Sequence, residues 1–394
     1  MSYTLHVDDF IDAAVDNLPR AEQLLAAHPE IAHAGFYVSL VLGDAPRVEH
    51  AITTNPALSS PGGPKHWSPL LYVCFSRFAN PASRRATHIV DTARLLLQHG
   101  ADPNAAWTFE SWPLSCLYGA TGLNNNPTLA LALLEAGANP NDGESLYHST
   151  EHPDLACVKL LLDHGATPHH PNVLKHLLDR EHPEALRLIL AAGADPNEPN
   201  PRGETSLHWA VYRRRSPALL AILLDHGVNK NAQRQDGRTA YSLAYLTGQT
   251  ATTEFLRSRG VNTGLSPLDR FLGDCMTTPS EHPAAPPPIL PSPEIDRLLV
   301  DLTEMHCTPA VKALLDGGVP VNALGLHGAT PLHWACWKGY PDLVALLLSH
   351  GASLTIEDTQ YHATPLGWLE HGSQYCRESG SDHPQVARLL NAAG

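Results

Sequence analysis

Apolar residues along this chain recur in short amphipathic stretches that end at a glycine. The clearest copy covers residues 330–352, which read TPLHWACWKGYPDLVALLLSHGA. Apolar positions three and four apart within 332–336 give a short helix one apolar face, and Gly339 can end that helix in the left-handed conformation. A second apolar run at 343–348 stops before Gly351. The pattern predicts two short antiparallel helices followed by a turn.

Degraded copies of this helix pair occur along most of the chain. Their second helices end in related motifs, such as LLLQHGADPN at 95–104, LILAAGADPN at 188–197 and LLDHGVNKN at 223–231. The terminal glycines lie at positions 100, 137, 165, 193, 227, 260, 318, 351 and 394, and the most regular spacings between them are 33 and 34 residues. Because one thin helix pair cannot bury its own apolar face, the copies are expected to stack on one another.

A motif at the start of the units carries a family resemblance. It reads TPLHWA at 330–335 and TSLHWA at 205–210, whereas TAYSLA at 239–244 and TPLGW at 364–368 lack the histidine. With the 33-residue spacing, it resembles the ankyrin repeat family, whose signature is T-P-L-H-x-A. The ending TPLGWLEHGS at 364–373 looks like that of certain bacterial ankyrin proteins. The resemblance covers nearly the whole chain and implies an all-α ankyrin-repeat solenoid of about eleven helix-turn-helix units with short β-hairpin loops, whose first helices and hairpins form a concave groove.

Departures from the repeat divide the chain into four parts. Residues 1–66 are predicted to be degenerate N-terminal capping repeats, because the ends of a solenoid face water. Residues 67–262 hold central ankyrin repeats, where two spacings of 28 residues predict truncated hairpin tips. Residues 263–293 form a proline-rich insertion, which begins with a helical pattern and continues with prolines that favour an extended segment at 279–293. Residues 294–394 resume as C-terminal ankyrin repeats.

Composition narrows the functional classes. The net charge of −14 argues against a general nucleic-acid binder, which needs a basic surface to neutralise phosphates. The chain shows no basic region followed by an apolar core at its start, and no apolar run approaches the roughly 20 residues that cross a bilayer, so neither a secretory signal nor a membrane partner is expected. Seven scattered cysteines without a CxxC pair are typical of small core residues in a reducing compartment, which favours a cytoplasmic location.

Twenty-four histidines raise the alternative of a metal site. The resemblance assigns His208 and His333 to the repeat motif, in which the side chain bonds a neighbouring loop. Histidines that precede the terminal glycines suit a helix C-terminus, where they can bond free carbonyls; these are His99, His164, His226 and His350. The loop pair His169 and His170 leaves a transition-metal site open, although no HExxH or CxxC spacing occurs. No metal or other cofactor is predicted.

Motifs of catalysis are absent from the sequence. It contains no GxSxG, no phosphate-binding loop and no dinucleotide-binding fingerprint, and the repeats leave no stretch of roughly 100 residues for a separate catalytic domain. An enzyme would have to build its site from histidines and carboxylates in the groove, and this stays an alternative. We expect a non-catalytic scaffold, adaptor or inhibitor that is a monomer and binds a protein partner through the concave groove.

Candidate contact residues follow from the positions that the repeat motif leaves free. Positions after the buried alanine of a first helix point partly into the groove, and tryptophan, tyrosine and arginine are enriched at binding hot spots. The candidates are Trp209, Tyr212, Arg213, Arg214, Arg215, Trp334, Trp337 and Lys338. A structural alternative is that Trp209 and Trp334 only pack against the adjacent first helix.

Basic residues also gather in two neighbouring units of this acidic chain. They are Arg202, Arg213, Arg214, Arg215, Lys230, Arg234 and Arg238. Such a cluster predicts an acidic patch on the protein partner, or a small anionic ligand. The alternative is a solvated face whose charges pair with Asp225 and Asp236.

Overall fold

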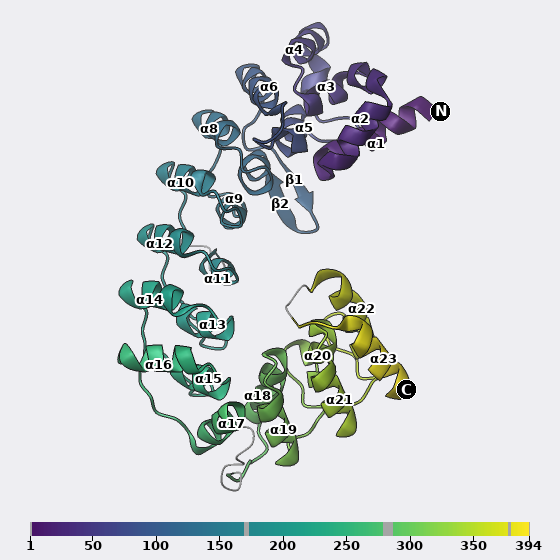
Figure 1. Cartoon of the computed structure of the whole chain (residues 1–394). Helices are drawn as coiled ribbons and strands as arrows, with labels where there is room; N and C mark the ends of the chain where they lie inside the picture. Colours follow the sequence, from purple (N-terminus) through teal and green to yellow (C-terminus); the bar gives the residue numbers. More distant parts are fainter. Residues whose placement is uncertain (1, 169–172, 279–286, 377–379, 394) are drawn as a thin grey trace. The chain divides into compact units, whose positions relative to one another are not determined.

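The computed structural model describes residues 2–168, 173–278, 287–376 and 380–393, with side chains from residue 6 onward. Twenty-three α-helices lie in these ranges. They belong to two compact units, Met1–Pro196 (unit 1) and Asn197–Gly394 (unit 2). Within each unit of Figure 1, short helices follow one another as stacked antiparallel pairs. The loop pair His169 and His170 lies outside the described residues.

Unit 1 contains six helix pairs and one β-hairpin among its described residues. Its helices are α1 (Ser2–Asp16), α2 (Leu18–Ala27), α3 (Phe36–Leu42), α4 (Ala45–Thr54), α5 (Pro69–Phe75), α6 (Ala86–Gln98), α7 (Cys116–Tyr118), α8 (Pro127–Glu135), α9 (Ser145–Ser149), α10 (Ala156–Asp163), α11 (Val173–Leu178) and α12 (Pro183–Ala191). A π-helical turn at Gly119–Leu123 continues α7. Strands β1 (Ala106–Phe109) and β2 (Trp112–Ser115) pair antiparallel, with Phe109 opposite Trp112.

Unit 2 contains five helix pairs and one unpaired helix among its described residues. Its helices are α13 (Ser206–Tyr212), α14 (Pro217–Asp225), α15 (Ala240–Leu246), α16 (Thr250–Ser258), α17 (Pro267–Thr277), α18 (Pro293–Glu304), α19 (Thr308–Asp316), α20 (Pro331–Lys338), α21 (Pro341–Ser349), α22 (Pro365–Tyr375) and α23 (His383–Ala393). The unpaired helix is α17, which packs against α15 and α19. It confirms the helical pattern expected at the start of the proline-rich insertion.

The motif histidines hold first helices to the next loop, as the family resemblance implies. His333 Nδ1 accepts from the backbone N–H of Thr330 at 3.1 Å, while its Nε2 lies 3.1 Å from the carbonyl oxygen of Ala363 in the following loop. His208 makes the same bridge to the carbonyl oxygen of Arg238 at 3.3 Å. Three histidines at second-helix ends bond the carbonyl four residues back, as predicted; these are His164, His226 and His350.

Asparagines in the turns tie each repeat to the next. Asn104 Nδ2 donates to the carbonyl oxygen of Gly137 at 3.1 Å, and its Oδ1 accepts from the N–H of Asn139 at 2.7 Å. Equivalent bonds start from Asn141, Asn197, Asn231 and Asn322. An asparagine is suited to this place because one amide side chain both donates and accepts.

Two further expectations can be compared with the structure. All seven cysteines are free and buried, which confirms that they are core residues. The β-hairpin loops are fewer than the resemblance implies, since β1–β2 is the one paired set of strands in the described ranges and the other repeat tips are turns. No described helix is both long enough and apolar enough to cross a membrane.

Candidate interaction surfaces

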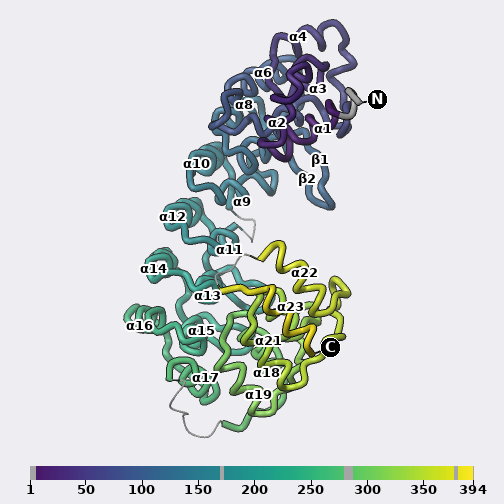
Figure 2. Tube along the Cα trace, turned by 45° about the vertical axis from the view of Figure 1, so that its right-hand side comes forward, coloured from purple at the N-terminus to yellow at the C-terminus, as the bar shows by residue number. Residues whose placement is uncertain are grey.

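Helix α18 lies on the inner side of unit 2, beside α13, α15 and α20 (Figures 1 and 2). Its contacts involve residues that the sequence assigned to partner binding. The phenol of Tyr212 on α13 donates to Glu304 at the end of α18. Arg214 Nη2 donates to the carbonyl oxygen of Met305 at 3.3 Å. The chain itself therefore fills the part of the groove that α13 faces.

Lys338 does not lie free in the groove, so that part of the sequence prediction is wrong. Its residue is 7% exposed, and its ammonium charge acts on Glu304. Burial raises the pKa of Glu304, although the Tyr212 hydrogen bond and the positive charge of Lys338 act in the opposite direction. Burial and the same carboxylate raise the pKa of the Tyr212 phenol well above its ordinary value. Tyr212, Glu304 and Lys338 therefore interact with one another inside unit 2.

Three arginines of the predicted basic cluster belong to a buried ion network. Arg234 lies 3.1 Å from Glu204, 3.1 Å from Asp236 and 3.0 Å from Asp301 of α18. Arg238 bonds Asp236 at 2.9 Å and Asp269 of α17 at 2.8 Å, and Arg202 pairs with Asp301. The network joins the loops before α13 and α15 to helices α17 and α18.

The ion network leaves little positive charge for a ligand. Arg234 and Arg238 are 6% and 7% exposed, so the cluster is not the solvated face that the sequence left open. Of the two carboxylates suggested as partners, Asp236 is in the network, whereas Asp225 pairs with Arg259. Although burial alone would raise the pKa of Asp236, the two adjacent guanidinium groups lower it. The structure therefore gives no support to an anion site at Arg202, Arg234 and Arg238.

The other basic candidates are placed differently. Arg213 lies over the Trp209 ring at 4.8 Å and over the Tyr212 ring at 5.9 Å, and these two rings stack 5.3 Å apart. Half-buried Arg215 bonds the carbonyl oxygen of Arg213. Arg214 is exposed, and exposed Lys230 donates to the carbonyl oxygen of Arg259 at 3.4 Å. The candidates on α13 thus form a stacked cluster of their own.

Trp334 and Trp337 open onto a cavity of about 590 Å³ at helices α20 and α22, which we name the aromatic hollow. Its lining consists of Leu326, His327, Trp334, Trp337, Tyr361, Ala363, Gly367, Trp368 and His371. The Trp334 and Trp368 ring centres lie 5.2 Å apart at an interplanar angle of 76°, and the Trp337 and Trp368 centres lie 6.1 Å apart at 73°. The structure therefore brings two predicted residues together with aromatic side chains that the sequence did not single out.

A glycine in the lining of the aromatic hollow stands at the position of the motif histidine. Gly367 is the third residue of α22, the position that His333 occupies in α20. A Cβ at Gly367 would meet only the Cβ of Ala363, at 3.3 Å. The TPLGW variant of the motif was thus a usable sequence signal, because it places a glycine where other repeats carry an imidazole.

Exposed apolar residues occur in the lining of the aromatic hollow and beside it in sequence. Leu326 and Tyr361 in its lining are 60% and 65% exposed. Leu324 and Leu366, close to lining residues in sequence, are 56% and 47% exposed. Monomeric proteins rarely keep contiguous apolar surface in water unless it serves an interaction.

Unit 1 has a second aromatic cavity, which we name the hairpin basin. It measures about 910 Å³ and is lined by Trp67, Phe75, Trp107, Phe109, Leu114 and Tyr118 together with acidic residues of α1. The carboxylate of Asp12 is paired with Lys65 at 2.8 Å, and that of Asp9 with Arg20 at 3.9 Å. Sequence reasoning missed this basin, although the run WTFESW at 107–112 was an available signal.

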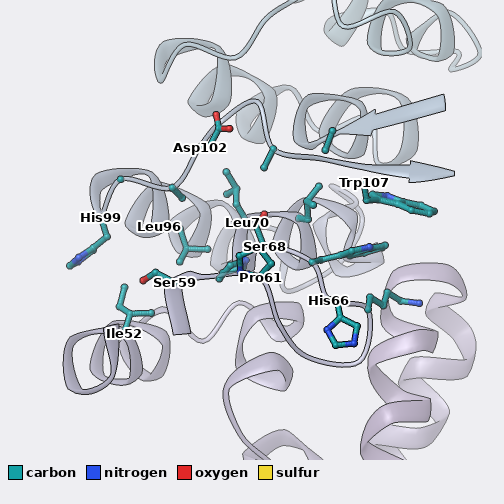
Figure 3. A pocket seen from close by; sticks show the side chains of 18 of the residues that line it. Ile52, Ser59, Pro61, His66, Ser68, Leu70, Leu96, His99, Asp102 and Trp107 are labelled. Carbon is teal, nitrogen blue, oxygen red and sulfur yellow. The ribbon is translucent and has the colours of Figure 1, made fainter. Parts of the chain in front are cut away.

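A further cavity of unit 1 bears on the enzyme alternative. It measures about 690 Å³ and lies between the loops that contain Ser59–Trp67 and His99–Trp107. Figure 3 shows His66 and His99 at opposite ends of the cavity, with Asp102 on the loop that follows His99. No hydrogen bond or ion pair joins these three side chains, and no cluster of metal-ligating residues occurs within the described ranges.

Comparison with known proteins agrees with this architecture. The family description "Ankyrin repeats (3 copies)" matches residues 174–266, and "Ankyrin repeat" matches residues 327–359. The chain therefore contains ankyrin repeats in these two ranges. Repeats of this family generally mediate protein–protein interaction, and the fold is typically non-catalytic.

One solved structure of an ankyrin repeat domain is similar to part of this chain. It is described as the ankyrin repeat domain of Bcl-3, a unique member of the IkappaB protein family, and the two chains share 25% sequence identity. The alignment covers 65% of this chain and 99% of that one, with a TM-score of 0.28.

Proposed function

We propose that this chain is a non-catalytic recognition module that binds a protein partner through the aromatic hollow of unit 2. The observation that carries the proposal is a solvent-open group of three tryptophans and one tyrosine in a cavity of about 590 Å³. Tryptophan and tyrosine contribute most to binding when a partner side chain enters a pocket that excludes water.

The aromatic hollow is a better partner site than the groove at α13. Tyr212 and Arg214 already bond Glu304 and Met305 of the same unit, so a partner would have to displace these contacts. The rings of the aromatic hollow pack around Trp368 but leave the cavity between them open. Binding there buries apolar surface without breaking an ion pair.

A selection from a synthetic displayed peptide library, in which lysine occurs both unmodified and Nε-methylated, tests the proposal while the partner is still unidentified. The full chain is used as bait, and enriched peptides are then measured against Gly367→Leu, which fills the aromatic hollow, and Trp337→Ala, which removes one wall. We expect each change to weaken the enriched peptides at least about tenfold, the size of a hot-spot effect. Circular dichroism checks that both variants remain folded.

The matched control is Trp112→Ala in unit 1, where the side chain is 53% exposed on β2. This change should leave the affinity of the enriched peptides unaltered. Peptides that depend on Trp112 and tolerate Gly367→Leu would move the recognition surface to the β1–β2 hairpin of unit 1 and overturn the proposal. A selection that yields no common sequence would also contradict it.

A further inference from the structure

The rings of the aromatic hollow are arranged as walls around a floor. Trp368 is 8% exposed and forms the floor. The rings of Trp334, Trp337 and Tyr361 stand at 76°, 73° and 68° to it. All four rings line the same cavity, and the face of an aromatic ring is the negative part of its quadrupole. A positively charged group at that point is attracted by several rings at once.

A buried carboxylate strengthens the negative character of the floor. Asp358 is 1% exposed, and its Oδ2 accepts from the indole Nε1–H of Trp368 at 2.9 Å. Burial alone would raise the pKa of Asp358, but backbone N–H groups of the 358–363 turn and this indole lower it to about 2. A hydrogen bond to an ionised acceptor polarises its donor, so electron density on the indole ring increases.

The lining of the aromatic hollow determines which kind of cation fits. No lysine, arginine, aspartate or glutamate is among its residues. An ordinary lysine ammonium has three N–H donors and an arginine has five, and each donor needs an acceptor when it leaves water. Methyl groups on the nitrogen remove these donors but keep the charge. An aromatic lining without carboxylates therefore suits a methylated ammonium group.

We propose that the aromatic hollow binds a methylated lysine side chain of the protein partner. This inference rests on the proposed function and names the group that the partner inserts. The cation lies against the rings of Trp334, Trp337 and Tyr361, and the aliphatic lysine stem leaves past the exposed side chain of Leu326. The net charge of −14 adds a general attraction for a basic segment of the partner.

Three small probes and the full chain test the inference by calorimetry. The first is N-acetyl-Nε-trimethyllysine methylamide. The second is its carbon isostere, in which a neutral tert-butyl group replaces the trimethylammonium group. The third is choline, which carries the same cation on a free metabolite. We expect the trimethyllysine probe to bind about tenfold tighter than its isostere, since the two differ in charge but not in shape.

Two results would overturn the inference. Equal affinity of the lysine probe and its isostere would show that the aromatic hollow selects apolar volume rather than charge. Tighter binding of choline than of the lysine probe would assign the cavity to a free metabolite. In a further case, the selected peptides bind the Gly367→Leu variant more weakly than the unsubstituted chain, while the isostere binds as tightly as the trimethyllysine probe. The inference then fails and the proposed function stands.

A variant separates the cation effect from simple packing. Trp337→Leu keeps an apolar wall but removes a π-face, so we expect the trimethyllysine probe to lose at least about fivefold in affinity. The isostere should change less than about twofold, because apolar contact is largely kept. Parallel losses for both probes would contradict a cation-binding site. Thermal unfolding of the variant shows whether the repeat has remained folded.

Discussion

The inner faces of the two units differ although both are built from the same helix pair. In unit 1, the β1–β2 hairpin and Trp67 line an open basin of about 910 Å³. In unit 2, α18 lies on the inner side and bonds the loops before α13 and α15 through Asp301. The inner side is therefore open at the hairpin in unit 1, whereas in unit 2 the part that α13 and α15 face is used for internal contacts with α18. A repeat motif predicts which residues are free of the stack, but not whether another part of the chain covers them.

The difference between the units begins at α17. This helix has no second helix of its own among the described residues, and it packs on both α15 and α19. The following pair contacts α17 through α19, while its first helix, α18, packs on α20. The unpaired helix thus interrupts the regular order of helix pairs next to the buried ion network.

Loss of Asp301 should reduce stability the most of the changes considered. It removes the contacts by which α18 distinguishes the inner side of unit 2 from that of unit 1. Asp301→Ala removes the carboxylate that Arg202 and Arg234 share. Glu204 and Asp236 still pair with Arg234, so the expected cost lies at the lower end of the about 3–5 kcal/mol of a broken buried ion pair. Urea unfolding of the full chain measures this as a loss of stability in unit 2. Asp225→Ala, which removes an exposed partner of Arg259, is the control and should cost at most about 1 kcal/mol. Equal costs would show that α18 is not held by the network.

Alanine substitutions at two glycines of α22 should change the stability in opposite directions, and by less than Asp301→Ala does. A Cβ at Gly372 would lie 2.3 Å from the carbonyl oxygen of Trp337, so Gly372→Ala should force α20 and α22 apart and cost about 1–3 kcal/mol. Gly367→Ala meets only Ala363 and should gain up to about 1 kcal/mol from helix propensity. Thermal unfolding compares the two variants. A destabilised Gly367→Ala protein would mean that the aromatic hollow has no spare volume.

Acidification should change the stability of the two units differently, and this is the smallest of the expected effects. Burial lowers the pKa of His208 and His333 in unit 2, so the folded state takes up protons less readily than the unfolded chain. These two residues therefore stabilise the folded state fully above the ordinary histidine pKa of about 6.5. Their contribution to the free energy of unfolding is lost as the pH falls below that value, toward their lowered pKa in the folded state. In unit 1, burial opposes protonation of His148, but Glu151 and Glu144 raise its pKa overall. The contribution of His148 to stability is therefore complete below the ordinary histidine pKa and is lost as the pH rises through its raised pKa in the folded state.

Amide hydrogen exchange measured unit by unit checks this contrast. Between about pH 7.5 and 5.5, protection should fall in unit 2 more than in unit 1. The variant His333→Gln keeps a polar side chain but does not titrate, so it should reduce the pH dependence near α20 and leave unit 1 unchanged. A parallel loss of protection in both units would contradict the assigned signs.

Local features of the fold were predictable because their causes are local. The helix pairs follow from apolar spacing and terminal glycines, and the role of His333 follows from a motif whose bonds reach only the adjacent loop. The position of α18 was not predictable. Its ion pairs join Arg202 and Arg234 to a carboxylate 99 and 67 residues further along the chain. A sequence shows that arginines cluster, but it does not show which distant carboxylates neutralise them.

The candidate site was predictable in part for the same reason. Trp334 and Trp337 were identified because one helix carries both, at positions the motif leaves free. Trp368 and Tyr361 come from the next repeat, and their role depends on how closely the two repeats pack. Lys338 was misjudged because its neighbour Glu304 belongs to α18, the helix whose placement the repeat pattern does not contain.

The bond between Arg202 and Asp301 also bears on how unit 2 reaches its native state. An ordinary repeat array is quasi-one-dimensional, so folding can begin at any repeat and spread to its neighbours. A contact that closes a loop of 99 residues raises the contact order of unit 2 and adds a slow search to that local process. Unit 1, in which stacked neighbours make most of the contacts, should therefore complete folding before unit 2.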